Sequence, residues 1–425
     1  MSSIIEQVDI GGFWGNHSVS IRFQESVNFL VGPNGSGKTT FINLLAAVLT
    51  ADWVALEQSE FQFIEVKLKR NSPYSKPLVR VEKIMSEAFG APEIQFSIAG
   101  KSTGAIEKFR LSDFVPLRYL HDPNYPRRMR MRLSGASGPL EEKLRTICDL
   151  SWLTVHRATG REESEPSHDH TVDRKLASIV GELSGFFASL QNNASAEVER
   201  FQEKVFLSLL SKESDEQLFN EVQKLNLSEE MSSLSDAFIE LGVKEKRFRK
   251  DLELHFERVR QVLKKIHGRE VLSISDLHAI VNTWGIHYIV SQWHEFTEIR
   301  EEIFSPKMLF LNLVARFFQR KTLSVDSGNR LFVTTQSGKK LSPKDLSSGE
   351  KQLLILLGET LLQRGAPYIF IADEPELSLH VEWQSRLVKS LRQLNPQAQT
   401  IFATHSPDIV GPFSEFVIEM PKVIR

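Results

Sequence analysis

The sequence predicts an α/β fold made of two strand-rich stretches that are split by a mainly helical insertion. Three observations lead to this prediction. A short apolar run at 27–31 leads into a glycine-rich turn, and a second apolar run at 368–372 ends in two acidic residues. Between these runs, apolar residues recur at steps of three and four, which is the spacing of one face of a helix.

The order of the patterns divides the chain into three expected regions, which are 1–160, 161–305 and 306–425. In the first region, apolar runs bounded by Gly, Pro and Ser indicate strands, and a helix is expected over 41–49. The expected strands of this region lie at 27–31, 61–68, 78–81, 94–98 and 152–155.

The middle region opens with a polar, acidic segment, 161–173, which we expect to be a loop. Two helical stripes follow it. Their apolar residues are Leu176, Ile179, Leu183, Phe186 and Leu190 in the first stripe, and Phe248, Leu252, Phe256, Val259, Leu263 and Ile266 in the second. In the last region, strands are expected at 322–325, 331–335, 368–372 and 400–403, and a helix at 353–362.

The glycine-rich turn matches the phosphate-loop pattern G-x-x-x-x-G-K-[ST]. Its residues are Gly32-Pro33-Asn34-Gly35-Ser36-Gly37-Lys38-Thr39. Glycines let backbone N–H groups turn inward around a phosphate, and the start of the following helix adds its positive dipole end. An ordinary glycine-rich turn is the alternative, but the strand before the loop and the apolar helix after it favour a phosphate cradle.

Three further motifs lie in the last region. Asp373 and Glu374 end an apolar strand, where one acid could hold Mg²⁺ and the other could polarise a water molecule. Residues 346–352 (LSSGEKQ) precede a helix and could present bare N–H groups to an anion, or could simply cap that helix. His405 follows another apolar strand, which we expect to lie beside the strand that ends at Asp373.

Together, these motifs resemble the nucleotide-binding domain of the ABC ATPase superfamily. The likeness rests on GPNGSGKT at 32–39, LSSGEKQ at 346–352, IADEPE at 371–376 and ATHSP at 403–407. It covers roughly 1–160 and 305–425, so each would be one half of an ATPase head. Within the superfamily, the sequence looks like the branch that holds SMC proteins, RecF, the zinc-hook ATPases of DNA repair and OLD-type ATPases.

The resemblance implies that the chain binds and hydrolyses ATP with Mg²⁺. Glu374 would be the hydrolytic base, His405 the γ-phosphate sensor, and Asp373 and Thr39 the ligands of the metal. The phosphates would lie on Asn34, Gly35, Ser36, Gly37, Lys38, Thr39 and Thr40. In this family, the ATP site is completed by the signature segment of a second copy, here Ser347, Ser348 and Gly349, in a head-to-head dimer or a higher homo-oligomer.

Two departures from the family pattern leave questions open. Ser348 stands where the family often has the first of two glycines. The family also has a glutamine where a strand exits toward the helical lobe, and none follows 152–155. His156 or Arg157 could substitute for it, Gln58 or Gln62 could serve instead, or both His156 and Arg157 could be ordinary strand-end residues.

Composition limits the classes of function. The 52 basic and 54 acidic side chains nearly cancel, so no global charge attracts the chain to nucleic acid or membrane. A single cysteine excludes a disulfide framework and a CxxC zinc hook. With neither a signal peptide pattern nor an apolar run long enough to cross a bilayer, the chain is expected to be cytoplasmic and to have no membrane partner.

The insertion is too short for the coiled coil of an SMC protein, and we find no spare acidic cluster for a nuclease core. We therefore expect a sensor or scaffold that holds and releases a separate effector, possibly a Toprim nuclease. Overall size, WLTVHR at 152–157 and VDRKL at 172–176 resemble standalone ATPase subunits of bacterial anti-phage systems such as PARIS. The alternatives are a RecF- or SMC-like ATPase that clamps DNA and, less favoured because of the insertion, an ABC transporter subunit.

Contact with nucleic acid is not required by this interpretation. A basic run at 125–132 alternates charged and apolar residues, as an edge strand would. It could contact phosphates or an acidic partner protein, or it could be a solvated strand face.

Overall fold

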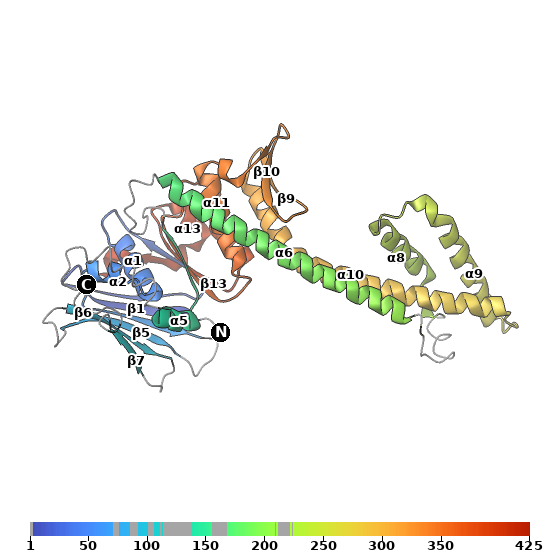
Figure 1. Cartoon of the computed structure of the whole chain (residues 1–425), viewed down its shortest axis with the longest axis horizontal. Helices are drawn as coiled ribbons and strands as arrows, with labels where there is room; N and C mark the ends of the chain where they lie inside the picture. Colours follow the sequence, from blue (N-terminus) through green and yellow to red (C-terminus); the bar gives the residue numbers. More distant parts are fainter. Residues whose placement is uncertain are drawn as a thin grey trace. The chain divides into compact units, whose positions relative to one another are not determined.

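A computed structural model describes residues 3–70, 76–85, 92–100, 106–110, 113, 138–154, 168–208, 210, 222 and 224–425. The chain forms two compact units, shown with their elements in Figure 1. The first unit comprises Met1–Ser184 and Leu309–Arg425, and the second comprises Gly185–Met308. The helices α6 (His168–Ser208) and α10 (Ile274–Phe317) each contribute residues to both units.

A five-stranded parallel sheet forms one layer of the first unit. Its order is β14-β3-β13-β12-β8, with bounds Val417–Glu419, Val27–Val31, Ala398–Ala403, Tyr368–Asp373 and Leu150–Thr154. β13 pairs in parallel with β12 on one side and with β3 on the other, which confirms the expected neighbourhood of β12 and β13. Because all five strands run in parallel, the loops that follow β3, β12 and β13 meet at one edge.

A six-stranded antiparallel sheet forms a second layer of the same unit. Its order is β2-β1-β4-β5-β6-β7, with bounds His17–Arg22, Ile4–Phe13, Phe63–Lys69, Leu78–Met85, Pro92–Ala99 and Ile106–Arg110. Alternate residues of β1, β4 and β5 face the core, including Val8, Val66 and Val81. The residues between them are polar, as expected for a sheet that is buried on one face.

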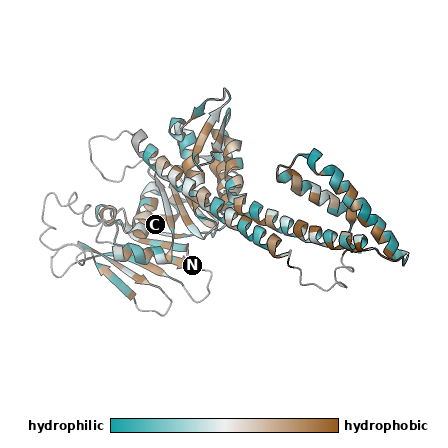
Figure 2. Cartoon of the chain, turned by 45° about the vertical axis from the view of Figure 1, so that its right-hand side comes forward, coloured by the Kyte–Doolittle hydropathy of each residue, from teal (hydrophilic) through white to brown (hydrophobic). Residues whose placement is uncertain are grey.

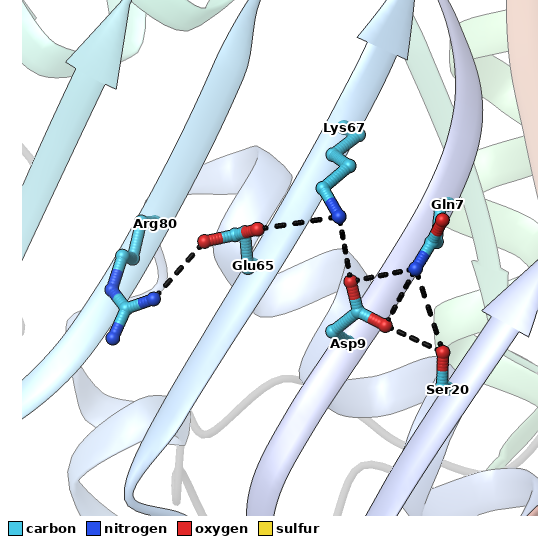
Figure 3. Close-up of polar contacts among 6 residues, drawn as sticks. All are labelled: Gln7, Asp9, Ser20, Glu65, Lys67 and Arg80. Atoms are coloured by element: carbon cyan, nitrogen blue, oxygen red, sulfur yellow. Dashed lines mark hydrogen bonds and ion pairs between the residues drawn. The ribbon is translucent and has the colours of Figure 1, made fainter.

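The opposite face of this sheet carries a polar network across four strands, drawn in Figure 3. The Asp9 carboxylate accepts hydrogen bonds from Gln7, from the Ser20 hydroxyl at 2.6 Å and from the Lys67 ammonium at 3.1 Å. Glu65 pairs with Lys67 and, at 3.0 Å, with the Arg80 guanidinium. These cross-strand pairs satisfy one another and fix the register of the sheet.

Helix α1 (Lys38–Thr50) shares one hydrophobic core with both sheets. Nine of its residues are buried, and seven of them belong to a cluster that includes Ile10 of β1, Phe96 of β6, and Ile371 of β12. Helices α2 (Trp53–Gln58) and α5 (Gly138–Ile147) join the same cluster. The start of α1, which carries the phosphate-loop lysine, is therefore held by the core.

Helix α11 (Ser348–Leu362) also belongs to the first unit and is buried along most of its length. The first part of α6 packs on it, since a Cβ added at Gly358 would lie 2.6 Å from Ile179 and 3.2 Å from Leu183. The Lys351 ammonium also pairs with Asp173 at 2.7 Å. The other elements are β9 (Lys321–Val325), β10 (Leu331–Thr335), β11 (Lys340–Leu341), η3 (Pro343–Asp345), α12 (Val381–Leu394), α13 (Pro407–Val410), η4 (Gly411–Phe416) and α14 (Met420–Val423).

The second unit is helical. Besides parts of α6 and α10, it holds α8 (Leu227–Glu240), η2 (Glu245–Arg247) and α9 (Arg249–His267). Figure 2 shows hydrophilic and hydrophobic residues on different sides of α8 and α9. The apolar side of α9 is buried through Leu252, Phe256 and Val259, as the second sequence stripe predicts. No helix in the described ranges is long and apolar enough to cross a membrane.

One local expectation is wrong over 168–173, and its remaining part, 161–167, lies outside the described residues. The segment 161–173 was expected to be a loop, but α6 already begins at His168. Asp173 lies near the start of α6, and its ion pair with Lys351 joins this end of the helix to α11. His156, Arg157 and the basic run 125–132 lie outside the described residues.

Candidate functional site

The phosphate loop connects β3 to α1. Gly37 directly precedes the helix and has φ 89°, in the left-handed region that glycine adopts at little cost. A Cβ added there would lie 3.1 Å from the rings of Phe13 and Trp14. The backbone conformation and the close approach of these two aromatic rings therefore both require glycine at position 37. The Trp14 side chain is 40% exposed.

The Lys38 side chain is buried against its own loop. Its ammonium donates to the carbonyl oxygens of Gly32 at 2.8 Å and Pro33 at 3.3 Å. Burial lowers the pKa of Lys38, while the carboxylates of Glu374, Asp373 and Glu376 oppose this change. Residues from the loop and from the end of β12 therefore share one electrostatic environment.

The other residues of the loop differ in exposure. Asn34, Gly35 and Thr39 are exposed, and Thr40 is half-buried. The Ser36 hydroxyl is buried and makes no hydrogen bond within the described part of the chain. The first backbone N–H groups of α1 have no partner inside the helix. The loop therefore offers hydrogen-bond donors to an anion at a helix N-terminus.

Thr39 and Asp373 come together although they are far apart in the sequence. The Thr39 hydroxyl donates to Asp373 Oδ1 at 3.3 Å, and Asp373 ends the buried strand β12. A carboxylate and a hydroxyl are hard oxygen ligands. Mg²⁺ is held in many nucleotide sites by one or two such protein groups, with phosphate and water completing its shell. The donor set therefore fits Mg²⁺.

Glu374 and His405 face each other at the ends of neighbouring strands. His405 Nε2 lies 3.4 Å from Glu374 Oε1, and both side chains are partly exposed. Glu374 has φ 48°, a strained value for a residue with a side chain, which costs about 1–3 kcal/mol and is common at functional sites. Its N–H donates to the Ala403 carbonyl at 2.8 Å, which holds the turn in place.

Glu376 is an acidic residue of this site that the sequence analysis did not single out. It is 8% exposed, and one of its oxygens accepts hydrogen bonds from the Thr404 hydroxyl and from the N–H groups of His405 and Ser406. Burial raises the pKa of Glu376, and these hydrogen bonds offset part of the increase. Its place in the run Asp373-Glu374-Pro375-Glu376 was the available sequence signal.

The signature segment forms the N-terminus of α11. Ser347 is the N-cap, and Glu350 Oε2 accepts from its N–H and its hydroxyl, both at 2.8 Å. The Lys321 ammonium binds the same oxygen at 2.8 Å. Burial alone would raise the pKa of Glu350, but these donors outweigh it and lower the pKa. Ser347 and Ser348 are exposed.

Gly349 is buried behind these serines. A Cβ added there would lie 2.3 Å from the carbonyl oxygen of Ser378. Ser378 belongs to the segment that follows Glu374. Within the described residues, the signature segment therefore packs against the segment that follows Asp373 and Glu374 and not against the phosphate loop.

Of the candidates for the family glutamine, Gln58 and Gln62 are described and both are exposed. Gln62 hydrogen-bonds Gly11 through its backbone and packs its side chain against Gly12. This places it beside the turn that carries Trp14. No side-chain hydrogen bond within the described chain identifies either glutamine as a site residue.

Two protein-family models match the chain. One, described as an AAA domain, matches residues 8–303, which is more than half of the chain. The other, described as "AAA domain, putative AbiEii toxin, Type IV TA system", matches residues 212–411.

Among curated proteins, a putative ABC transporter ATP-binding protein of Clostridium acetobutylicum is 33% identical over 89 residues. The match covers 20% of this chain and 31% of the relative, so it spans less than a third of that protein.

Among solved structures, the Smc head domain of Pyrococcus furiosus, bound to the C-terminal domain of ScpA, is similar with 14% identity and a TM-score of 0.43. The similarity covers 96% of this chain and 91% of that chain. The SMC head domain from Thermotoga maritima is also similar, with 14% identity and a TM-score of 0.34, over 96% of this chain and 90% of that chain.

Proposed function

The chain belongs to the AAA-domain family whose model matches residues 8–303, and from this premise we propose that it binds ATP with Mg²⁺ and hydrolyses it. The observation that carries the proposal is the meeting of three loops at one edge of the parallel sheet. They bring Lys38 and Thr39 to Asp373, and Glu374 to His405.

In the proposed complex, the β- and γ-phosphates lie at the N-terminus of α1. The Lys38 ammonium exchanges the carbonyls of Gly32 and Pro33 for phosphate oxygens, and the N–H groups of the loop from Asn34 to Thr40 donate to the rest. Thr39 and Asp373 hold the metal. When bound, Mg²⁺ neutralises charge on the phosphates and stabilises the charge of the transition state.

Hydrolysis follows from the pair at the ends of β12 and β13. Glu374 accepts a proton from a water molecule whose oxygen attacks the γ-phosphorus, while the bond from that phosphorus to the bridging oxygen of ADP breaks. His405 contacts the γ-phosphate and stabilises the charge that develops there. The products are ADP and inorganic phosphate, and the strained turn of Glu374 keeps the base fixed.

The adenine base is proposed to stack on Trp14. Its ring lies against the loop at Gly37 and remains partly exposed, and an aromatic face of this kind is a suitable platform for a base.

We also propose that the site is completed by a second copy of the chain. Ser347 and Ser348 are exposed at the N-terminus of α11, and the positive end of this helix suits the γ-phosphate of a neighbouring molecule. The closed state would then be a head-to-head dimer with two ATP molecules between the heads.

At the level of biology, we propose that this ATPase is a sensor or scaffold that holds and releases a separate effector in anti-phage defence. The description of the family match at 212–411, which names a type IV TA system, is compatible with this role.

The chemical proposal is tested by two variants. Lys38→Ala should lose nucleotide binding and hydrolysis together, because Lys38 contacts the phosphates before and during reaction. Glu374→Gln should keep ATP bound while kcat falls by on the order of 10² or more, the usual weight of a general base. Phosphate release and binding of a fluorescent ATP analogue measure both quantities. A Glu374→Gln protein with normal kcat would exclude Glu374 as the base.

The role in defence is tested by looking for activity on nucleic acid. The purified protein, with ATP and Mg²⁺ or Mn²⁺, is expected to leave DNA and RNA intact, because the effector is a different chain. Gel analysis of plasmid and total RNA provides the measurement, with Lys38→Ala as the control. Cleavage that persists in Lys38→Ala would contradict the proposal, since it would reveal a second active centre.

A further inference from the structure

Glu376 connects the acidic turn after β12 to the turn after β13. One carboxylate oxygen accepts from three consecutive residues, namely the Thr404 hydroxyl, the His405 N–H at 3.1 Å and the Ser406 N–H at 3.3 Å. The carboxyl group is buried, and its second oxygen has no hydrogen-bond partner in the described chain. The hydrogen bonds of this side chain are therefore all directed at the turn that carries His405.

These bonds set the backbone of that turn. The Ser406 N–H also donates to the Thr404 hydroxyl at 2.9 Å, and the Ser406 hydroxyl donates to Gln384 on α12 at 2.6 Å. The His405 ring, in contrast, has one ion-pair partner among the described residues, Glu374. The position of the ring thus depends on the backbone turn, and the turn depends on Glu376.

The segment around Glu376 also contacts the signature helix. The Gln352 side chain of α11 donates to the Pro375 carbonyl at 2.9 Å, and Gly349 lies directly against the Ser378 carbonyl. Pro375 and Ser378 flank Glu376. One continuous set of contacts therefore runs from the N-terminus of α11, through 375–378, to the turn of His405.

We propose that Glu376 is a positioning residue for ATP hydrolysis, which holds His405 against Glu374 and links its position to the N-terminus of α11. The inference rests on the proposed ATPase activity. Because Glu376 acts through His405 and makes no hydrogen bond to the phosphate loop in the described chain, its loss should reduce kcat and leave ATP affinity nearly unchanged.

The test is a double-mutant cycle between Glu376 and His405, which separates coupled from independent effects. Glu376→Ala removes the acceptor that three donors share, and we expect kcat to fall by about 10- to 100-fold, as for a catalytic group displaced by around 1 Å. In a His405→Ala background, the same substitution should lower kcat by less than about threefold, because the group that it positions is absent. ATP affinity should change by less than about threefold in both backgrounds, since the change is confined to the transition state.

Conservative variants keep the test valid if Glu376→Ala does not fold. Glu376→Gln keeps an acceptor oxygen and should retain more activity than Glu376→Ala, and Thr404→Val removes one donor alone. Either can replace Glu376→Ala in the cycle. Glu382→Ala, an exposed glutamate of α12, is the matched control and should behave as wild type. Thermal unfolding checks the fold of each variant.

The outcomes are distinct. Equal loss of kcat in the wild-type and His405→Ala backgrounds would overturn the inference, since Glu376 would then act independently of His405. Normal kcat in all the Glu376 and Thr404 variants would overturn it as well. Wild-type protein with no more ATPase activity than Lys38→Ala would instead overturn the proposed function, and the positioning role with it.

Discussion

At the scale of single residues, the site depends on backbone conformations that few residue types adopt. Glu374 is held at φ 48° by a hydrogen bond to Ala403, and Gly37 is held at φ 89° against Phe13 and Trp14. Gly37 directly precedes Lys38, which is proposed to bind the phosphates, and Glu374 is itself the proposed hydrolytic base. The strain at Glu374 is consistent with a turn that is maintained for chemistry rather than for stability.

Motif residues could be predicted from the sequence, whereas the contacts that give Trp14 and Glu376 their roles could not. The motif residues occur in short patterns whose spacing is dictated by the phosphate chain or the metal. Trp14 reaches the phosphate loop from a different strand pair, and the role of Glu376 depends on the turn at 404–406. Both contacts join residues that are distant in the sequence, so no local pattern encodes them.

Trp14 gives a prediction at this scale. Trp14→Ala should raise the KM for ATP by about 3- to 10-fold, because aromatic stacking contributes about 0.5–1.5 kcal/mol, and kcat should change little. Trp14→Phe should keep most of the affinity, since it keeps an aromatic face.

Inorganic tripolyphosphate is the matched control ligand. It has no base, so its inhibition constant should be the same for wild type and Trp14→Ala. Equal loss of affinity for ATP and tripolyphosphate would show that Trp14 supports the loop rather than the base.

At the scale of elements, strands and helices next to motifs could be predicted well. The expected strand at 27–31 is β3, and the expected helix at 353–362 lies within α11. The strand pair β1–β2 was missed, although Val8 and Ile10 of β1 alternate with polar neighbours. The order β14-β3-β13-β12-β8 could not be read from the sequence, because it is fixed by pairing between segments up to several hundred residues apart.

The junction of α5 and β8 carries the second prediction. Cys148, the only cysteine of the chain, is buried there, and burial raises the pKa of its thiol to about 12. Because the thiolate is the reactive form, native protein at pH 8 should react with a disulfide reagent far more slowly than protein unfolded in denaturant. Absorbance of the released thiolate measures the rate, and Cys148→Ala is the blank.

The same pKa gives a dependence of stability on pH. The folded state keeps the thiol protonated above the ordinary pKa of 9.0, so the unfolded state loses this proton first. The contribution of this thiol to the free energy of unfolding is therefore complete below about pH 9 and is lost as the pH rises toward 12.

Rapid reaction of Cys148 with the disulfide reagent in native protein at pH 8 would contradict the labelling prediction, because it would show that the junction of α5 and β8 opens easily.

At the scale of the whole molecule, we propose that a second copy completes the ATP site of the first. Within the described residues, Gly349 packs on Ser378 and Ser347 is engaged by Glu350, so both residues are held by their own head. Ser348 is exposed beside them. The exposed Ser348 can contact a second copy without rearrangement of the first. For this reason we propose that hydrolysis requires a dimer.

Ser348 is therefore the position at which to test the dimer. Ser348→Arg adds bulk to the exposed surface while leaving the Ser347–Glu350 cap in place, whereas a side chain at position 349 would clash with the Ser378 carbonyl within one head. We expect Ser348→Arg to bind ATP normally and to lose hydrolysis, and Ser348→Ala to keep both. Wild-type hydrolysis per chain should fall on dilution.

Mixing two inactive variants then decides whether the site is shared. Lys38→Ala lacks a working phosphate loop and Ser348→Arg lacks a working signature, so a mixed dimer has one site with both defects and one with neither. Equal amounts should restore hydrolysis to about a quarter of the wild-type rate, because half of the dimers are mixed and each has one intact site. Each variant mixed with itself is the control. No recovery in the mixture, with a wild-type rate per chain that is independent of concentration, would mean that each head completes its own site, because only sites formed between copies can be repaired by mixing.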